Sequence, residues 1–170
     1  RPSCHKAFPE ALAILAGDAM SIHAFSVLAN STALSDAQKV RLIAELAEES
    51  GHHGMIAGQV LDMEQEGRAD VTVDQLKTMC AFKTGALIRV ACRMGCIAAN
   101  ATDEQIKAAD TYGSYLGLAF QIVDDILDVT STTDVLGKPV GSDAEENKVT
   151  FVILLGLEAA QKEAAALTEK

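Results

Sequence analysis

The sequence predicts an all-α protein that folds as a helical bundle. Apolar residues recur at helical spacing, three segments open with capping boxes, and no segment shows the alternation of a strand. Apolar residues make up 49% of the chain and aromatic residues 4%, and there are three prolines, a composition that suits packed helices. A chain of 170 residues can bury one core, so we expect a single all-α domain over residues 1–170.

The first two predicted helices lie in the first half of the chain. Pro9 suits a first helical turn and opens a helix through about Ala29. After a short turn, Ser35 and Gln38 form a capping box that starts a second helix. This helix keeps its period toward residue 66, and two glycines loosen its middle, Gly51 and Gly54.

Two more capping boxes start the next helices, Thr72 with Gln75 and Thr102 with Gln105. They predict helices over about 73–100 and 103–129. Residues 131–147 contain glycine and proline and are expected to form a loop before a last helix from about residue 149. Long helices joined by short turns favour a bundle.

Charge and cysteine content narrow the possible partners and compartment. The net charge of −10 disfavours nucleic acid and anionic membranes as partners. We expect no apolar run to approach the roughly 18–20 residues that cross a bilayer, and therefore no membrane span. The four cysteines lack CxxC spacing, which favours free thiols in a cytoplasmic protein over a metal site.

An acidic face interrupts the apolar stretch LGLAFQIVDDILDV. Gln121, Asp124, Asp125 and Asp128 stand at positions i, i+3, i+4 and i+7, so one helical face is polar where a core face should be apolar. Unpaired carboxylates against a core would each cost several kcal/mol. They therefore need a cation, and carboxylates without convergent His or Cys favour Mg²⁺ over zinc.

Lysines could complete a site for an anion. Lys83 emerges from an apolar helical stripe and precedes Thr84 and Gly85, the latter able to accompany a kink; it is either a snorkelling lysine or a functional one. Lys138 lies within the predicted loop and Lys148 at the start of the last predicted helix. Both are either salt-bridge partners or donors to an anionic ligand held by the metal. The pair Gln59 and Asp62 is unremarkable by itself.

A rival metal site is less favoured. Glu49 and His52 match the ExxH pattern of di-iron bundles, but such a site needs a second ExxH, which the chain lacks. We therefore expect the neighbouring His52 and His53 to lie at the surface.

In order along the chain, the segments RPSCHKAF, ALAILAGDA, GQVLD, KTGALIR, FQIVDDILD, LGKPVGSD and LLGLEAA resemble the trans-isoprenyl diphosphate synthases. The match extends along almost the whole chain and is nearest to bacterial farnesyl or geranylgeranyl diphosphate synthases. The resemblance implies an isoprenoid synthase fold and an enzyme that elongates an allylic diphosphate with isopentenyl diphosphate. It also implies Mg²⁺, a homodimer and a short-chain product such as farnesyl diphosphate. Terpene cyclisation on the same fold is a weaker alternative.

The resemblance assigns roles residue by residue. Asp124 and Asp128 resemble metal ligands, with Asp125 as a helper. The catalytic contacts to the allylic diphosphate are expected from four residues, and Lys138 is a further candidate for binding substrate. The four are Lys83, Thr84, Gln121 and Lys148.

The family's first aspartate-rich motif would lie before Arg1. We therefore expect this chain to be an incomplete piece of the full domain and inactive alone. The missing motif also motivates an alternative from another class, a non-catalytic helical partner subunit of a heteromeric prenyl synthase.

Overall fold

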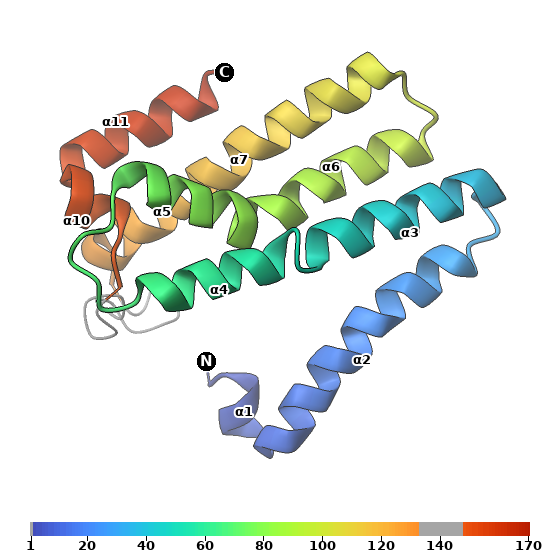
Figure 1. Ribbon diagram of the computed structural model, residues 1–170, viewed down its shortest axis with the longest axis horizontal. Coiled ribbons are helices and arrows are strands. Elements are labelled where there is room, and N and C mark those ends of the chain that lie inside the picture. The colour runs from blue at the N-terminus through green and yellow to red at the C-terminus, as the bar shows by residue number, and fades with distance from the viewer. Residues whose placement is uncertain (1, 133–147) are drawn as a thin grey trace.

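The computed structural model describes residues 2–132 and 148–170, and in these ranges every regular element is a helix (Figure 1). In chain order the elements are α1 (Cys4–Ala7), α2 (Glu10–Ala29), α3 (Asp36–Ser50), α4 (Met55–Gln65), α5 (Val73–Cys80), the π-helical η1 (Ala81–Gly85), α6 (Ala86–Ala98), α7 (Asp103–Thr130), α10 (Phe151–Leu155) and α11 (Leu157–Thr168). The predicted all-α class is confirmed.

Local capping chemistry starts three of these helices as predicted. At each of α3, α5 and α7 the N-cap hydroxyl accepts a hydrogen bond from the backbone N–H three residues on, and the side-chain oxygen of the glutamine there accepts one from the N-cap backbone N–H. Pro9 stands directly before α2, which ends at Ala29 as expected. Most of the predicted loop lies outside the described residues.

Two predicted helices are in fact broken. The helix expected over residues 36–66 ends at Ser50 and restarts at Met55, where Gly54 packs so closely that a Cβ would lie 2.0 Å from the carbonyl oxygen of Glu49. The last predicted helix is divided at Gly156, whose φ of 81° is accessible mainly to glycine. Both breaks depend on close approach or backbone conformation, which apolar periodicity does not report.

The helix predicted over residues 73–100 is continuous in space but changes its winding in the middle. The expected irregularity beside Gly85 takes the form of the π-helical η1, a feature often found at functional sites. Helices α4 and α7 both pack directly on this segment. A Cβ on Gly58 of α4 would lie 2.0 Å from the backbone nitrogen of Lys83, and one on Gly117 of α7 would lie 2.8 Å from the Cα of Gly85. Glycine at both positions lets the backbones touch.

Two apolar clusters hold the bundle together. The larger cluster joins α5, α7, α10 and α11 and includes the buried Leu76, Ile122 and Phe151. The smaller cluster, around Leu42 and Ile97, lies where α3, α6 and α7 meet. In Figure 1, α6 and α7 run alongside one another, and α11 lies on the opposite side of α7 from α6. The larger cluster therefore anchors the half of α7 that carries the acidic face.

An ion-pair network links α3, α6 and α7 near the middle of the bundle. Arg93 donates to Glu45, Glu49 and Asp110 at 2.6 to 2.9 Å, and Arg89 donates to Glu49 at 3.0 Å. Burial by itself would lower the pKa of Arg93, but its three carboxylate partners raise the pKa overall. Since Glu49 is bound by two arginines, the structure gives the di-iron hypothesis no support.

Helix α2 exposes an apolar surface. It is long and apolar enough to cross a bilayer, with a mean hydropathy of 1.6, and none of its residues is buried. The expectation that no apolar run reaches that length is therefore wrong for this helix, although length and composition alone are weak evidence for a span. Asp18 places a charged residue within the unbroken helix, and Leu28 near its end packs against the smaller cluster.

Candidate active site

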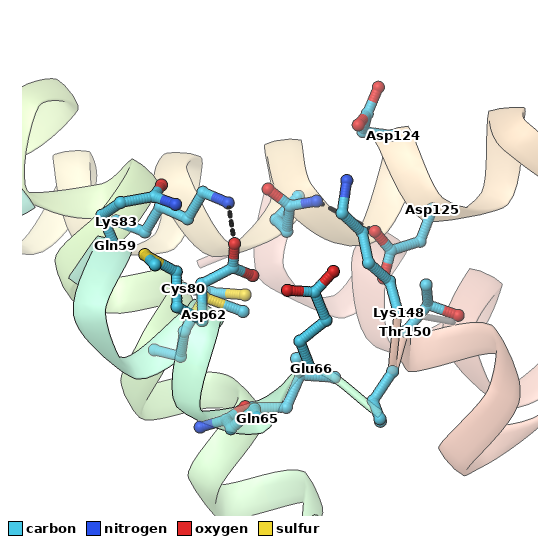
Figure 2. Close-up of a pocket in the computed structure, with 15 residues that line it drawn as sticks. Gln59, Asp62, Gln65, Glu66, Cys80, Lys83, Asp124, Asp125, Lys148 and Thr150 are labelled. Atoms are coloured by element: carbon cyan, nitrogen blue, oxygen red, sulfur yellow. Dashed lines mark hydrogen bonds and ion pairs between the residues drawn. The ribbon is translucent and has the colours of Figure 1, made fainter. Parts of the chain in front are cut away.

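A cavity of about 530 Å³ opens between α4, α5, η1, α7 and the segment that leads into α10. Its polar lining, much of it drawn in Figure 2, consists of Gln59, Asp62, Gln65, Glu66, Cys80, Lys83, Gln121, Asp124, Asp125, Lys148 and Thr150. Its apolar lining is Met63, Leu76, Met79 and Val149. Four carboxylates and two ammonium groups thus surround a space within the usual size range of small-molecule sites.

The three aspartates of the acidic face have different surroundings. Asp124 lines the cavity and is partly exposed. Asp125 also reaches the cavity but is only 4% exposed, whereas Asp128 is 1% exposed and is not among the lining residues. Among the predicted metal ligands, Asp124 is therefore the one best placed to meet a ligand in the cavity.

A hydrogen-bond relay connects η1, α7 and α10. The Thr84 hydroxyl donates to Gln121 Oε1 at 3.2 Å, and Gln121 Nε2 donates to Asp125 Oδ1 at 2.9 Å. The other carboxylate oxygen of Asp125 accepts the backbone N–H of Phe151 at 2.8 Å, in the first turn of α10. Asp125 thus ties α10 to α7, and Thr84, which is not among the cavity-lining residues, orients Gln121.

Lys83 enters the cavity instead of snorkelling into solvent. Its Nζ lies 2.5 Å from Asp62 Oδ2, an ion pair between residues on η1 and α4 (Figure 2). The side chains are 32% and 21% exposed, so both groups remain accessible to a ligand in the cavity. The functional interpretation of Lys83 is favoured over the snorkelling one.

Lys148 enters the same cavity from the segment before α10. Figure 2 shows its side chain extending toward α7, while the Glu66 side chain points into the space between Asp62 and Lys148. The structure therefore brings Lys83, Gln121, Asp124 and Lys148 to one cavity from separate elements. Lys138 lies outside the described residues.

Sequence reasoning did not select six further polar residues of the cavity, which are Gln59, Asp62, Gln65, Glu66, Cys80 and Thr150. The i, i+3 spacing of Gln59 and Asp62 was visible, but nothing in the sequence indicated that they face Lys83. Burial raises the pKa of the Cys80 thiol to about 12, with Asp125 and Asp62 adding to the shift, so the group is neutral at ordinary pH. A neutral thiol is a poor metal ligand and a poor nucleophile.

The donor chemistry fits magnesium. No group of three or more His, Cys, Asp or Glu side chains that could hold a metal is present within residues 2–132 and 148–170. Magnesium is commonly bound through one or two carboxylates together with substrate phosphates and water, and Asp124 with its neighbours on α7 offers carboxylates of this kind. The two ammonium groups across the cavity suit the phosphate part of such a site.

Comparison with known proteins gives a consistent result. The model of the family described as polyprenyl synthetase matches residues 1–170. The chain is 46% identical over 171 aligned residues to farnesyl diphosphate synthase of Escherichia coli K12, covering 99% of this chain and 57% of that protein. It is 42% identical to geranylgeranyl pyrophosphate synthase 7 of Arabidopsis thaliana, covering 93% of this chain and 46% of that one. The chain thus spans about half the length of these curated relatives.

A solved structure shows the same fold. The geranyltransferase of Helicobacter pylori, complexed with magnesium and isoprenyl diphosphate, superposes with a TM-score of 0.90 at 36% identity, over 99% of this chain and 55% of that one. The expected isoprenoid synthase fold is thereby confirmed, and α2 falls within the shared part. The relatives named here are synthases or transferases, which gives no support to a non-catalytic partner subunit.

Proposed function

The chain belongs to the polyprenyl synthetase family, and we propose that it forms the allylic diphosphate site of a Mg²⁺-dependent prenyltransferase. The enzyme would join an allylic diphosphate to isopentenyl diphosphate. The observation that carries the proposal is the convergence of Lys83, Lys148, Gln121 and Asp124 on one cavity. A short-chain product such as farnesyl diphosphate, a homodimer and a cytoplasmic location belong to the same proposal.

Charge balance explains why both lysines and carboxylates are needed. A diphosphate is multiply anionic and would be repelled by Asp124 and Asp125 alone. Asp124 would hold a magnesium ion, which would supply positive charge to offset this repulsion and to stabilise the leaving pyrophosphate. Lys83 and Lys148 donate charge-assisted hydrogen bonds to phosphate oxygens from other sides of the cavity.

The remaining residues place and shelter the reacting groups. One hydrogen of the Gln121 carboxamide is directed to Asp125, and the carboxamide nitrogen has a second hydrogen to offer a phosphate oxygen. The apolar wall that includes Met79 and Val149 excludes water from the hydrocarbon chain. Ionisation breaks the allylic C–O bond, and the pyrophosphate leaves with the electron pair. The isopentenyl double bond then forms the new C–C bond, and pyrophosphate accepts the proton that is lost.

The proposal is tested with the protein encoded by the complete reading frame that contains this chain. Incubation with isopentenyl diphosphate, geranyl diphosphate and Mg²⁺ should release pyrophosphate and yield a longer prenyl diphosphate. Chelation of the metal should stop the reaction, and Asp124→Ala should reduce it by at least 100-fold, because a carboxylate of the metal site is lost. Absence of pyrophosphate release, together with unchanged diphosphate binding by Asp124→Ala, would refute the proposal.

A further inference from the structure

Asp62 is one of the cavity residues that have no part in the mechanism above. It comes from α4, 21 residues before Lys83, and its Oδ2 accepts a hydrogen bond from Lys83 Nζ at 2.5 Å. A lysine side chain has four rotatable bonds and loses considerable entropy when ordered. Asp62 restricts that freedom before any ligand is present and directs the ammonium into the cavity.

The same helix also fixes the backbone of Lys83. Gly58 stands one turn before Asp62 on α4 and is buried against η1. A Cβ at this position would lie 2.0 Å from the Lys83 nitrogen and 2.4 Å from its Cα. Helix α4 therefore contacts Lys83 at both ends, at the backbone through Gly58 and at the ammonium through Asp62.

We propose that Asp62 is a positioning residue that holds Lys83 ready for the diphosphate. The inference rests on the proposed function, because it assumes that an anion enters this cavity. Without Asp62, the Lys83 ammonium could move into solvent or toward Glu66, whose side chain points into the cavity (Figure 2). The Lys83 side chain would then lose its freedom only when the diphosphate binds, and this entropy cost would weaken the affinity by on the order of tenfold.

If Asp62 acted only through its charge, replacing it would change the affinity for diphosphate in the opposite direction. Replacing Asp62 with asparagine removes a negative charge from the cavity, which by itself would strengthen the binding of an anion. Loss of positioning weakens it. The direction of the change in affinity thus separates the two effects, and a double-mutant cycle shows whether Asp62 acts through Lys83.

The experiment measures the binding of inorganic pyrophosphate with Mg²⁺ by calorimetry, and steady-state kinetics with geranyl diphosphate, in the complete protein. Asp62→Asn should raise the Kd for pyrophosphate and the KM for geranyl diphosphate about tenfold, with kcat changed less than about threefold. In a Lys83→Met background, Asp62→Asn should change the Kd by less than about twofold.

Glu163→Gln is the matched control. It breaks the Lys77–Glu163 pair, which also joins a lysine to a distant helix at 2.7 Å with side chains 36% and 37% exposed, but lies away from the Lys83 cavity. This variant should bind pyrophosphate like the wild type and show a comparable, small change in stability.

Several outcomes would overturn the inference: tighter binding by Asp62→Asn, equal effects in the wild-type and Lys83→Met backgrounds, an equal loss in Glu163→Gln, or no pyrophosphate binding by the wild type. Failure of the proposed function has a different signature. If the protein did not transfer prenyl groups, but Asp62→Asn still weakened pyrophosphate binding only when Lys83 was present, the reaction would be refuted and the role of Asp62 would stand.

Discussion

Gly58→Ala tests how the crossing of α4 over η1 controls Lys83. The added Cβ would meet the backbone nitrogen of Lys83 at 2.0 Å, its Cα at 2.4 Å and the carbonyl carbon of Phe82 at 2.6 Å. These are backbone atoms, which cannot rotate away as a flexible side chain would. Ordinary van der Waals contact begins at 3.4 Å, so α4 must retreat by about 1.4 Å, the difference between 3.4 and 2.0 Å.

Both stability and activity should respond. Overpacking of this kind costs up to about 3 kcal/mol, and the higher helix propensity of alanine returns about 1 kcal/mol, so we expect a net loss of about 2 kcal/mol. Displacement of a substrate-positioning group by about 1 Å can reduce activity about 100-fold. We therefore expect kcat/KM for the allylic diphosphate to fall by between about 10-fold and 100-fold.

Urea denaturation and steady-state kinetics of the complete protein measure the two effects. Gly95→Ala is the control, because Gly95 lies within α6 and a Cβ there would have no neighbour within 4 Å. That variant should be more stable by about 0.5 to 1 kcal/mol and as active as the wild type. If Gly58→Ala behaved in the same way, the close contact between α4 and η1 would be refuted.

Three further predictions concern stability and thiol chemistry. Arg93→Met should lower the free energy of unfolding by roughly 3 kcal/mol, because three partly buried carboxylates lose a cation that they share and only Glu49 and Asp110 keep Arg89; denaturant titration measures it. Asp125→Asn should lower the free energy of unfolding by about 1 to 3 kcal/mol, since an amide cannot accept both hydrogen bonds at two oxygens. Alkylation of the native protein at pH 8, followed by mass spectrometry, should label Cys4 and spare Cys80, whose thiol pKa is raised to about 12.

Each of these predictions has a contrary outcome. Equal stability of Arg93→Met and the wild type would show that the α3–α6–α7 network is not stabilising. Wild-type stability of Asp125→Asn would show that the bond from Asp125 to α10 does not stabilise the fold. For Cys80, the raised pKa means that the folded state holds its proton more tightly than the unfolded state. The protonated Cys80 thiol therefore contributes its full stabilisation below about pH 9, and this contribution is lost as the pH rises toward 12. Alkylation of Cys80 as fast as that of Cys4 would contradict the prediction that Cys80 is spared.

Much of the fold could be predicted because its signals are local. A capping box involves two residues three positions apart, so Ser35 with Gln38 predicts the start of α3 without any knowledge of its neighbours. The acidic face of α7 was visible for the same reason, since helical spacing alone places Asp124 beside Asp128. The polar position of Lys83 within an apolar stripe is a signal of the same kind.

The environment of these residues could not be predicted in this way. Nothing near Asp125 in the sequence indicates that it accepts the backbone N–H of Phe151, 26 residues later. The break between α3 and α4 is equally hidden, because apolar periodicity continues across Gly51 and Gly54. Periodicity shows which face is apolar, and does not show where two backbones come close enough to exclude a Cβ.

Local sequence patterns predict where three helices start, the acidic face of α7 and a lysine at a position where an apolar residue would be expected. The tertiary packing places Lys83 against Asp62, joins Asp125 to α10 and leaves Asp124 at the cavity. The physical reason is range. Helical spacing and capping follow from bonds between residues three or four positions apart, whereas the partner of a charge depends on how helices cross, and here that crossing requires glycine at residue 58.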